Sequence, residues 1–354
     1  MKDNILNNTK NVEDIEINFK FDGPMSQSVK ELHIYSKEGK FNKLKKLIKD
    51  KEFQGSTLNL ALRNLITNTA KICNPNYMEC FKLLLSTNID LNYKFENNKT
   101  ILMHLIELQE AQYIKEFLDA ESKYINQETN KFHTIEEEEI YEMEQKEKFF
   151  CQKDLNNNNF FSYLCSKDSN DDDYLNIFNY IYEIYPFQNN RKVKISKKIR
   201  EIFDSLLIET NNDGNNLMNL SLIYKRPKLV LKLIEIKKFV PNLNKKKENY
   251  IHSAVRGGNL ICLKIMLLYC DINDLSSKNI DMLTPAQLAY KLGYITISNI
   301  ITEYQNNYNE DDYKGIFRLD IENYKKDVIF FNIFFLSIKK LIIYFINIVM
   351  YEYI

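Results

Sequence analysis

Hydrophobic and polar positions follow a helical period through most of the chain, and they predict short apolar helices that come in pairs. In the best-preserved pair, Thr284 can accept a backbone N–H at the start of the first helix, and Pro285 takes the first helical position. Gly293 then ends this helix at a residue that tolerates positive φ. A second helix follows, with isoleucines on one face. Because one pair is too short to bury its apolar face alone, the pairs must stack on one another.

The residue pattern that starts the first helix of a pair, here called an opening, occurs seven times in similar form. The openings lie near residues 30, 56, 100, 159, 216, 249 and 284. The last three are separated by 33 and 35 residues, whereas the earlier ones are spread by insertions. The predicted fold class is therefore all-α, with about seven degenerate helix pairs. Since the connections differ in length, we expect the stack to be either kinked or split into two arrays near residues 127–158.

A period near 33 residues with an opening similar to T-P-L-H-x-A resembles the ankyrin repeat. The resemblance is specific over residues 211–304, fair over 28–126 and poor over 127–210, and only the last unit retains Thr-Pro. It implies a right-handed solenoid of helix-turn-helix units that binds proteins on its concave side. It also implies that the motif's histidine braces neighbouring turns; His33 and His252 match that position, and His104 lies one place away.

The chain is predicted to contain a disordered lead (1–27), N-terminal ankyrin-like repeats (28–126), an acidic insert with a degenerate repeat and a basic helix (127–210), C-terminal ankyrin repeats (211–304), and a linker with a hydrophobic tail (305–354). In the insert, Glu136 to Glu139 are interpreted as a solvated helix face rather than a catalytic or cation site. Asp171 to Asp173 fit a helix start, and the basic residues from Arg191 to Arg200 fit the outside of an amphipathic helix.

The hydrophobic tail has three open interpretations. Residues 328–350 hold sixteen Val, Ile, Leu or Phe, enough to span a bilayer. Lys339 and Lys340 lie at the centre, where together they raise the free energy of membrane insertion by about 5–7 kcal/mol. The apolar residues lower the same free energy by roughly 5–10 kcal/mol. The segment is therefore a membrane helix, an apolar cap on the last repeat, or a mis-assembled end of the gene model.

Composition and motifs argue against an enzyme activity and against a nucleic-acid partner. The chain has 48 basic and 48 acidic residues, so no global field attracts it to nucleic acid or to a membrane. The six cysteines form no C-x-x-C pair, which favours buried thiols in a reducing compartment over a zinc site. Nucleotide-binding, metalloprotease and nucleophile-elbow motifs are absent from the sequence. We therefore predict no enzyme activity, no cofactor and no metal, with a cytoplasmic or nuclear location and membrane association as the alternative.

The resemblance indicates a scaffold or adaptor that binds an acidic peptide or protein. The alternatives are the same array tethered to a membrane through residues 328–350, and the truncated regulatory portion of a larger enzyme or transporter. The positions that match the family's binding face are Lys37, Tyr224, Lys245, Lys246, Lys247, Arg256, Asn279 and Lys291. Tyr224 and Arg256 are the predicted anchors, because Tyr and Arg are favoured at interface hot spots. Ordinary solvated lysines are the alternative interpretation of the basic positions.

Overall fold

The structure, a computed structural model, describes residues 26–69, 76–165, 171–190, 193–238, 240–307, 315, 317–318 and 320–326. Within these ranges the regular structure is helical apart from one isolated bridge between Lys94 and Thr100, so the all-α prediction is confirmed. None of the described helices is both long and apolar enough to cross a membrane. The hydrophobic tail at 328–350 and most of the predicted N-terminal lead lie outside the described residues. The chain divides after Asp90 into two compact units.

The first unit contains two helix pairs: α1 (Gln27–Lys37) with α2 (Phe41–Asp50), and α3 (Gly55–Thr69) with α4 (Asn76–Leu85). Helix α1 packs on α3, and α2 packs on α4. The turn between α1 and α2 passes through Gly39, which has a φ of +63°, and a Cβ built there would lie 3.3 Å from the Tyr77 ring. The Tyr77 hydroxyl donates a hydrogen bond of 2.9 Å to the carbonyl of Lys37. This tyrosine therefore fixes the tight turn of the first pair.

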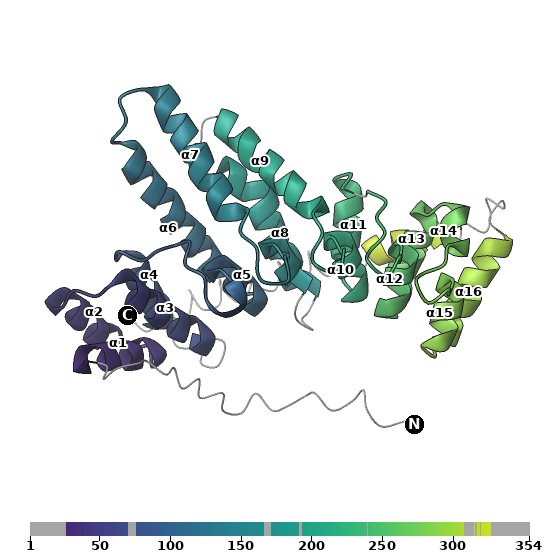
Figure 1. Ribbon diagram of the computed structural model, residues 1–354, viewed down its shortest axis with the longest axis horizontal. Coiled ribbons are helices and arrows are strands. Elements are labelled where there is room, and N and C mark those ends of the chain that lie inside the picture. The colour runs from purple at the N-terminus through teal and green to yellow at the C-terminus, as the bar shows by residue number, and fades with distance from the viewer. Residues whose placement is uncertain are drawn as a thin grey trace, which may run out of the picture. The chain divides into compact units, whose positions relative to one another are not determined.

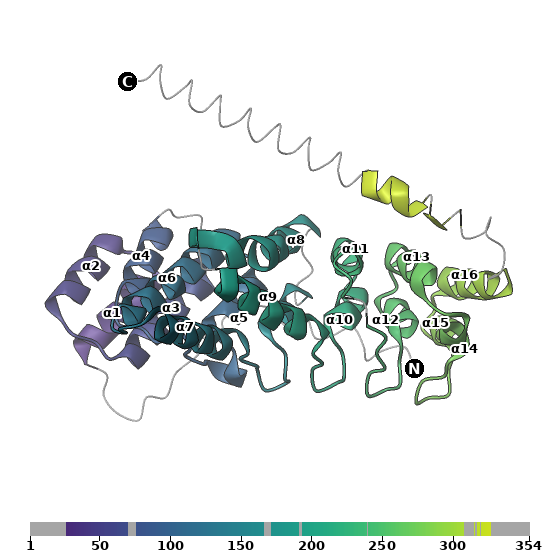
Figure 2. The same ribbon diagram turned by 90° about the horizontal axis from the view of Figure 1, so that it is seen from above.

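The second unit extends the same alternation, and Figures 1 and 2 show its helices in order. Its elements are α5 (Ile101–Leu108), α6 (Ala111–Thr129), α7 (Ile135–Phe150), η2 (Phe160–Cys165), α8 (Asp171–Asn179), η3 (Tyr180–Ile184), η4 (Tyr185–Asn190), α9 (Val193–Ile208), α10 (Leu217–Ile223), α11 (Pro227–Glu235), α12 (Tyr250–Gly257), α13 (Leu260–Tyr269), α14 (Ile272–Ser276), α15 (Pro285–Lys291) and α16 (Ile295–Asn306), preceded by η1 (Glu96–Asn98). Contacts join first helices in the order α5, η2, α10, α12 and α15. They join second helices in the order α6, α8, α11, α13 and α16.

The predicted helix ends are present in the C-terminal pairs. Thr284 accepts the backbone N–H of Gln287 and Pro285 is the first helical residue, so the sequence-based start of α15 is confirmed. Gly258 and Gly293 follow α12 and α15 with φ of +66° and +82°. Gly257 shows how tightly the first helices pack, because a Cβ built there would lie 2.2 Å from the carbonyl oxygen of Leu222 in α10.

The predicted opening near residue 159 forms a 3₁₀ helix instead of an α-helix. The Asn159 side chain is buried and donates a hydrogen bond of 2.7 Å to the carbonyl of Leu206 in α9. It therefore serves the packing of α9, while Asn216 and Asn249 use the same side chain to cap their own helices. Phe160 and Phe161 fill the space beside Phe203 of α9.

Helices α6, α7 and α9 lie side by side and extend beyond the neighbouring pairs of their unit (Figure 1). The charged runs of the insert pair with each other: Lys194 Nζ lies 3.1 Å from Glu139, and Lys198 Nζ lies 3.8 Å from Glu147. Glu136 is exposed. The acidic run is therefore a solvated and paired helix face, as predicted, and α9 carries its basic residues outside a buried apolar side.

One buried polar network holds the insert helices together. The Lys146 ammonium of α7 contacts the Glu121 carboxylate of α6 and lies 2.7 Å from the Tyr185 hydroxyl, which donates to Glu121 at 2.8 Å. The Lys146 and Glu121 side chains are both almost fully buried, and Phe150 packs edge-on against the Tyr185 ring. Because solvent does not reach this cluster, it fixes the register of α6 and α7 rather than offering a reactive group.

Candidate protein-binding surface

In the second unit, each first helix is preceded by a five-residue loop closed by the same backbone hydrogen bonds. In loop 244–248, the N–H of Asn244 donates to Glu248 at 3.1 Å, and the N–H of Lys247 donates back to Asn244 at 2.8 Å. The equivalent bonds close the loops 95–99, 154–158, 211–215 and 279–283. The fourth residue has positive φ in every one: Asn98, Asn157, Gly214, Lys247 and Met282. One loop geometry is therefore built from five different sequences.

A side chain at the first position shapes the last four of these loops. The Oδ1 atom of Asn244 accepts the backbone N–H groups of Lys246 and Glu248, at 2.9 and 3.0 Å. Asp154, Asn211 and Asn279 make the equivalent pair of bonds in their own loops. Such Asx turns give the backbone a local alternative to helix or strand pairing. This role was not predicted from the sequence, although Asn or Asp stands five residues before each of the last four openings.

Asn279 therefore does not belong with the exposed positions predicted to contact a partner. Its side chain is only 2% exposed, and besides shaping its own loop it donates a hydrogen bond of 3.2 Å to Glu248. A partner cannot reach an amide that points into the protein and is already hydrogen-bonded. We assign Asn279 to loop positioning.

Neighbouring loops are joined tip to tip, and Figure 2 shows the loops before α10, α12 and α15 projecting on one side. In the last four loops, the second residue donates its N–H to the carbonyl of the third residue of the preceding loop. These bonds are Leu155 to Asn97 (2.9 Å), Asn212 to Asn156 (2.8 Å), Lys245 to Asp213 (2.9 Å) and Ile280 to Lys246 (2.8 Å). The tips thus form one continuous backbone ladder, and their side chains are held at fixed spacing.

Arg256 locks loop 244–248 to the end of α12. Its Nε atom lies 2.7 Å from Glu248 Oε2, and its second nitrogen contacts the other carboxylate oxygen. The Glu248 side chain is 1% exposed and that of Arg256 is 28% exposed. Burial raises the pKa of Glu248, but the hydrogen bond and positive charge of Arg256, with hydrogen bonds from Asn279 and Asn244, outweigh it and lower this pKa below its usual value. The guanidinium predicted to anchor a partner is therefore engaged within the chain.

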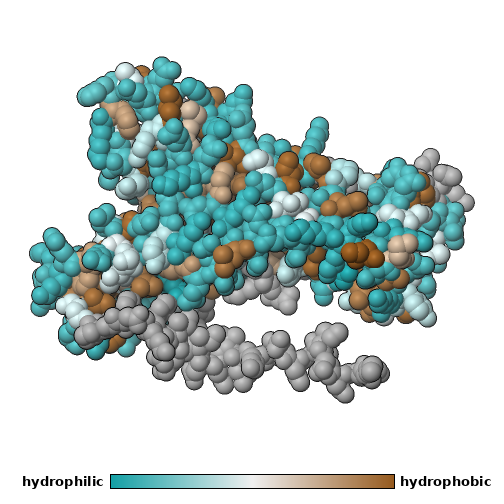
Figure 3. All heavy atoms as spheres, viewed as in Figure 1, coloured by the Kyte–Doolittle hydropathy of each residue, from teal (hydrophilic) through white to brown (hydrophobic). Residues whose placement is uncertain are grey.

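The remaining predicted contact residues are exposed. Lys245, Lys246 and Lys247 form the tip of loop 244–248, and none of them makes an ion pair with another described residue. The next loop places the exposed Ile280 and Met282 beside them. Tyr224 and Lys291 are exposed at the ends of α10 and α15, and Lys37 is exposed at the end of α1 in the first unit. Over α10 to α16 the face seen in Figure 3 is largely hydrophilic, with separate small hydrophobic patches.

His252 ties α12 to the loop that follows it. Its Nδ1 atom lies 2.8 Å from Asn249 Oδ1, and its Nε2 atom lies 3.1 Å from the carbonyl of Leu283 in loop 279–283. Burial lowers the pKa of His252, although the hydrogen bond to the Leu283 carbonyl opposes this shift. His252 is therefore a brace between neighbouring units, as predicted. In the first unit, His33 Nδ1 lies 3.1 Å from the Asn64 amide of the next pair.

Metal-binding side chains are not gathered anywhere in the described ranges. No group of three or more His, Cys, Asp or Glu side chains there could hold a metal ion. Cys80, Cys165 and Cys262 are buried outside any disulfide, in agreement with the prediction of buried thiols, whereas Cys151 is exposed. Burial raises the pKa of the Cys80 thiol to about 11, and the negative charge of Glu79 adds to the shift, so this thiol is a poor nucleophile.

No family model matches the sequence, and no curated protein matches it either. Among solved structures, the chain is similar to one from Bdellovibrio bacteriovorus, the predatory endopeptidase Bd0816 in complex with the immunity protein Bd3460. The alignment has a TM-score of 0.37 and 15% sequence identity, and it covers 77% of this chain and 97% of that chain.

Proposed function

We propose that this protein is a non-enzymatic interaction module that binds a protein partner on the row of loop tips and the adjoining ends of the first helices. The observation that carries the proposal is the backbone ladder that joins five loops from residue 95 to residue 283. Binding costs less free energy when the contacting groups are already ordered. A row of side chains mounted on a hydrogen-bonded ladder meets that condition.

An ankyrin-type solenoid is the repeat architecture that best accounts for this arrangement. In the described part of the chain a helix pair follows each of the seven openings, and the fourth pair begins with the 3₁₀ helix η2. Within the second unit, first helices contact first helices and second helices contact second helices. Stacking of that kind buries a continuous core between units that are individually too small to fold. The brace from His252 to the following loop supports the same assignment, since it uses the histidine that the motif supplies.

An acidic peptide or protein is the partner that the loop row fits best. Lys245, Lys246 and Lys247 bring three exposed charges to one tip, although the chain as a whole is electrically neutral. Charges at the rim of an interface act mainly on the association rate and its salt dependence. Ile280 and Met282 add apolar surface beside them. The buried thiols of Cys80, Cys165 and Cys262 fit a reducing compartment, and we propose a cytosolic or nuclear location.

The test is a quantitative pull-down from lysate with the wild type and two charge-reversal variants. Lys245→Glu/Lys246→Glu alters the tip and leaves Lys247, with its positive φ, unchanged. Lys123→Glu/Lys148→Glu makes the same change of net charge on exposed positions of the insert helices. We expect the tip variant to lose its partners, and the wild-type interaction to weaken as salt is raised, while the control retains them. Equal retention by both variants, or equal loss, would refute the proposal.

A further inference from the structure

Helix α13 is apolar around its whole circumference, and Lys264 is its only charged residue. A helix of this kind is normally covered on every side. Leu260, Ile261 and Leu268 share the face of Lys264 by helical spacing, and all three keep some exposure. The outer side of α13 therefore carries apolar surface that the stacked helix pairs leave uncovered.

A short helical segment that follows the last pair lies on this side, opposite the loop tips (yellow in Figure 2). Its described residues, here called the docked segment, are 315, 317–318 and 320–326. Phe317 and Ile321, four residues apart, are each 5% exposed. Arg318 and Glu322 beside them are exposed. The docked segment is therefore amphipathic, and its apolar face is turned towards the protein.

The docked segment touches two helix pairs at once. The Phe317 ring packs edge-on against Tyr304 of α16, with 5.4 Å between the ring centroids. Asp320 forms an ion pair with Lys264 of α13, and the Lys264 ammonium lies 5.8 Å from the centroid of the Phe317 ring. An eighth repeat unit would stack on the seventh pair alone, whereas this segment lies across the sixth and seventh pairs. Its position is that of a bound helix rather than of another repeat.

The docked segment has a small anchor. Among its described residues, Phe317 and Ile321 are the buried ones. The ion pair is partly open to water, since 40% of the Asp320 side chain is exposed. A helix of this length is not stable by itself in water, so it forms only while it is docked. We therefore expect docking to be reversible, and release to uncover the outer side of α13.

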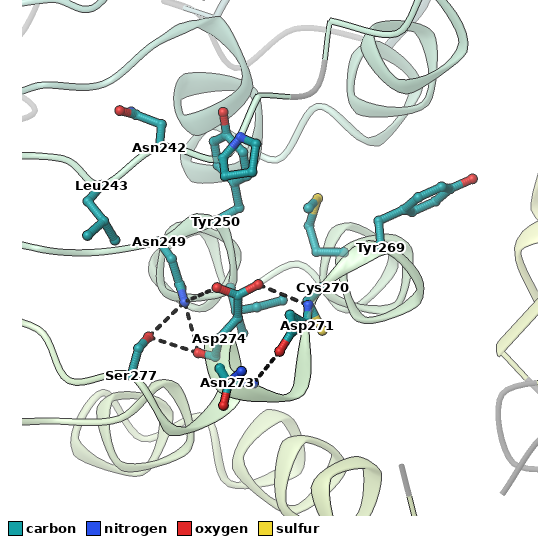
Figure 4. Close-up of a pocket in the computed structure, with 13 residues that line it drawn as sticks. Asn242, Leu243, Asn249, Tyr250, Tyr269, Cys270, Asp271, Asn273, Asp274 and Ser277 are labelled. Atoms are coloured by element: carbon teal, nitrogen blue, oxygen red, sulfur yellow. Dashed lines mark hydrogen bonds between the residues drawn. The ribbon is translucent and has the colours of Figure 1, made fainter. Parts of the chain in front are cut away.

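The pocket at the C-terminal end of α13 gives no comparable indication of a ligand (Figure 4). The polar groups along its edge are hydrogen-bonded to one another. The Asn249 amide donates to the Ser277 hydroxyl at 2.8 Å, and that hydroxyl donates to the carbonyl of Asp274 at 2.9 Å. These bonds fix the connection between α13 and α15. The outer side of α13 differs, because a segment of the chain is docked on it.

We propose that the outer side of α13 and α16 is a second docking site, which binds an amphipathic helix of a protein partner and is closed by the docked segment when that partner is absent. The docked segment shows what the site selects: an aromatic residue, an acid three residues later and an aliphatic residue one position further. A partner helix with this pattern makes the same contacts to Tyr304 and Lys264. A longer helix also covers Leu260 and Leu268. This site is independent of the loop tips.

The test measures binding of a fluorescein-labelled peptide with the sequence of residues 315–326 to the full chain by fluorescence anisotropy. Phe317→Ala/Ile321→Ala in the protein detaches the docked segment and frees the site. Arg318→Ala/Glu322→Ala changes only its exposed side and is the matched control. We expect the first variant to bind the peptide about tenfold more tightly than the wild type, whose site is mostly occupied, and the control to bind like the wild type. No binding by the first variant, or the same affinity as the wild type, would overturn the proposal.

Charge exchange then locates the site. The Phe317→Ala/Ile321→Ala protein should bind a peptide carrying Asp320→Lys about tenfold more weakly than the unchanged peptide. Adding Lys264→Glu to that protein should reverse the order of the two peptides. Circular dichroism checks that each variant retains its helix content. Equal binding of both peptides before Lys264→Glu is added would show that Lys264 is not the contact, and it would refute the assignment whatever the further variant does.

Discussion

Replacing Arg256 with methionine should destabilise the second unit, because it leaves a buried carboxylate without its counter-charge. Methionine retains most of the apolar stem, so the change isolates the loss of the guanidinium. The Glu248 side chain is 1% exposed and cannot reach water, while that of Arg256 is 28% exposed. Removing one partner of a buried ion pair costs about 3–5 kcal/mol. Water already screens part of this pair through Arg256, so we expect the lower end, about 3 kcal/mol.

The reverse substitution should cost less. In Glu248→Gln, the guanidinium of Arg256 remains, and its exposed part can donate hydrogen bonds to water. The glutamine still accepts one hydrogen bond from it, so the expected loss is about 1–2 kcal/mol. The double variant Arg256→Met/Glu248→Gln should be more stable than Arg256→Met alone, because no buried charge is left unpaired.

The pH dependence gives an independent check. In the wild type the folded-state pKa of Glu248 is lowered. The ionised carboxylate therefore makes its full contribution to the stability of the fold above the usual carboxyl pKa of about 4.3. This contribution is lost as the pH falls through the folded-state pKa. In Arg256→Met, burial becomes the main influence and raises that pKa above the unfolded value. The unpaired charge of Glu248 then destabilises the fold fully at neutral pH, and protonation of this carboxylate relieves the destabilisation. The stability gap between wild type and variant should therefore narrow from pH 7 towards pH 5.

Urea denaturation followed by circular dichroism at pH 7 and pH 5 measures these differences. Hydrogen exchange of peptides that cover residues 240–260 localises the loss to loop 244–248 and α12. Equal destabilisation by Arg256→Met and Glu248→Gln would refute the reasoning, and so would a stability gap that widens on acidification. Either result would mean that the buried Glu248 carboxylate does not depend on the partly exposed Arg256.

Three further substitutions test other parts of the fold by urea or thermal denaturation. Gly257→Ala should cost about 1–3 kcal/mol, because its Cβ would lie 2.2 Å from the carbonyl oxygen of Leu222; a wild-type midpoint would contradict the close approach. Asn279→Ala should cost about 1–3 kcal/mol through the loss of the Asx turn while leaving the exposed lysine tip intact. Lys146→Met should cost about 3–5 kcal/mol, and adding Glu121→Leu should recover most of it; failure to recover would show that packing, not charge, fixes α6 and α7.

Local features made much of the helix pattern predictable. Capping residues and glycines act on residues within a few positions of themselves. Thr284 therefore indicates a helix start, and Gly258 a helix end, without knowledge of the fold. The prediction of an α-helix start at Asn159 was wrong because this side chain interacts with a distant part of the chain. Its side chain is taken by a carbonyl in α9, 47 residues away, and no local pattern reveals that competition.

The candidate surface was less predictable, because the direction of a loop side chain depends on the neighbouring loops. Lys245 and Asn279 both lie in loops that precede first helices, yet the lysine is exposed at a tip while the asparagine turns inward to Glu248. Sequence favoured Arg256 as a partner contact because arginine is common at interfaces. Its pairing with Glu248, eight residues earlier across a turn and a helix, becomes visible only when loop and helix are placed together.

The ladder of loop tips has a direction. Each of the last four loops donates one N–H to the loop before it, and each of the first four accepts one at the carbonyl of its third residue. In loop 279–283 the residue at that third position is Asp281. A complete loop with its helix pair can therefore be duplicated or deleted during evolution while the same pattern of bonds is kept, whereas a residue gained inside a tip disturbs the rungs that this loop makes with its two neighbours. The long insert of α6, α7 and α9 obeys this constraint, since it falls between rungs.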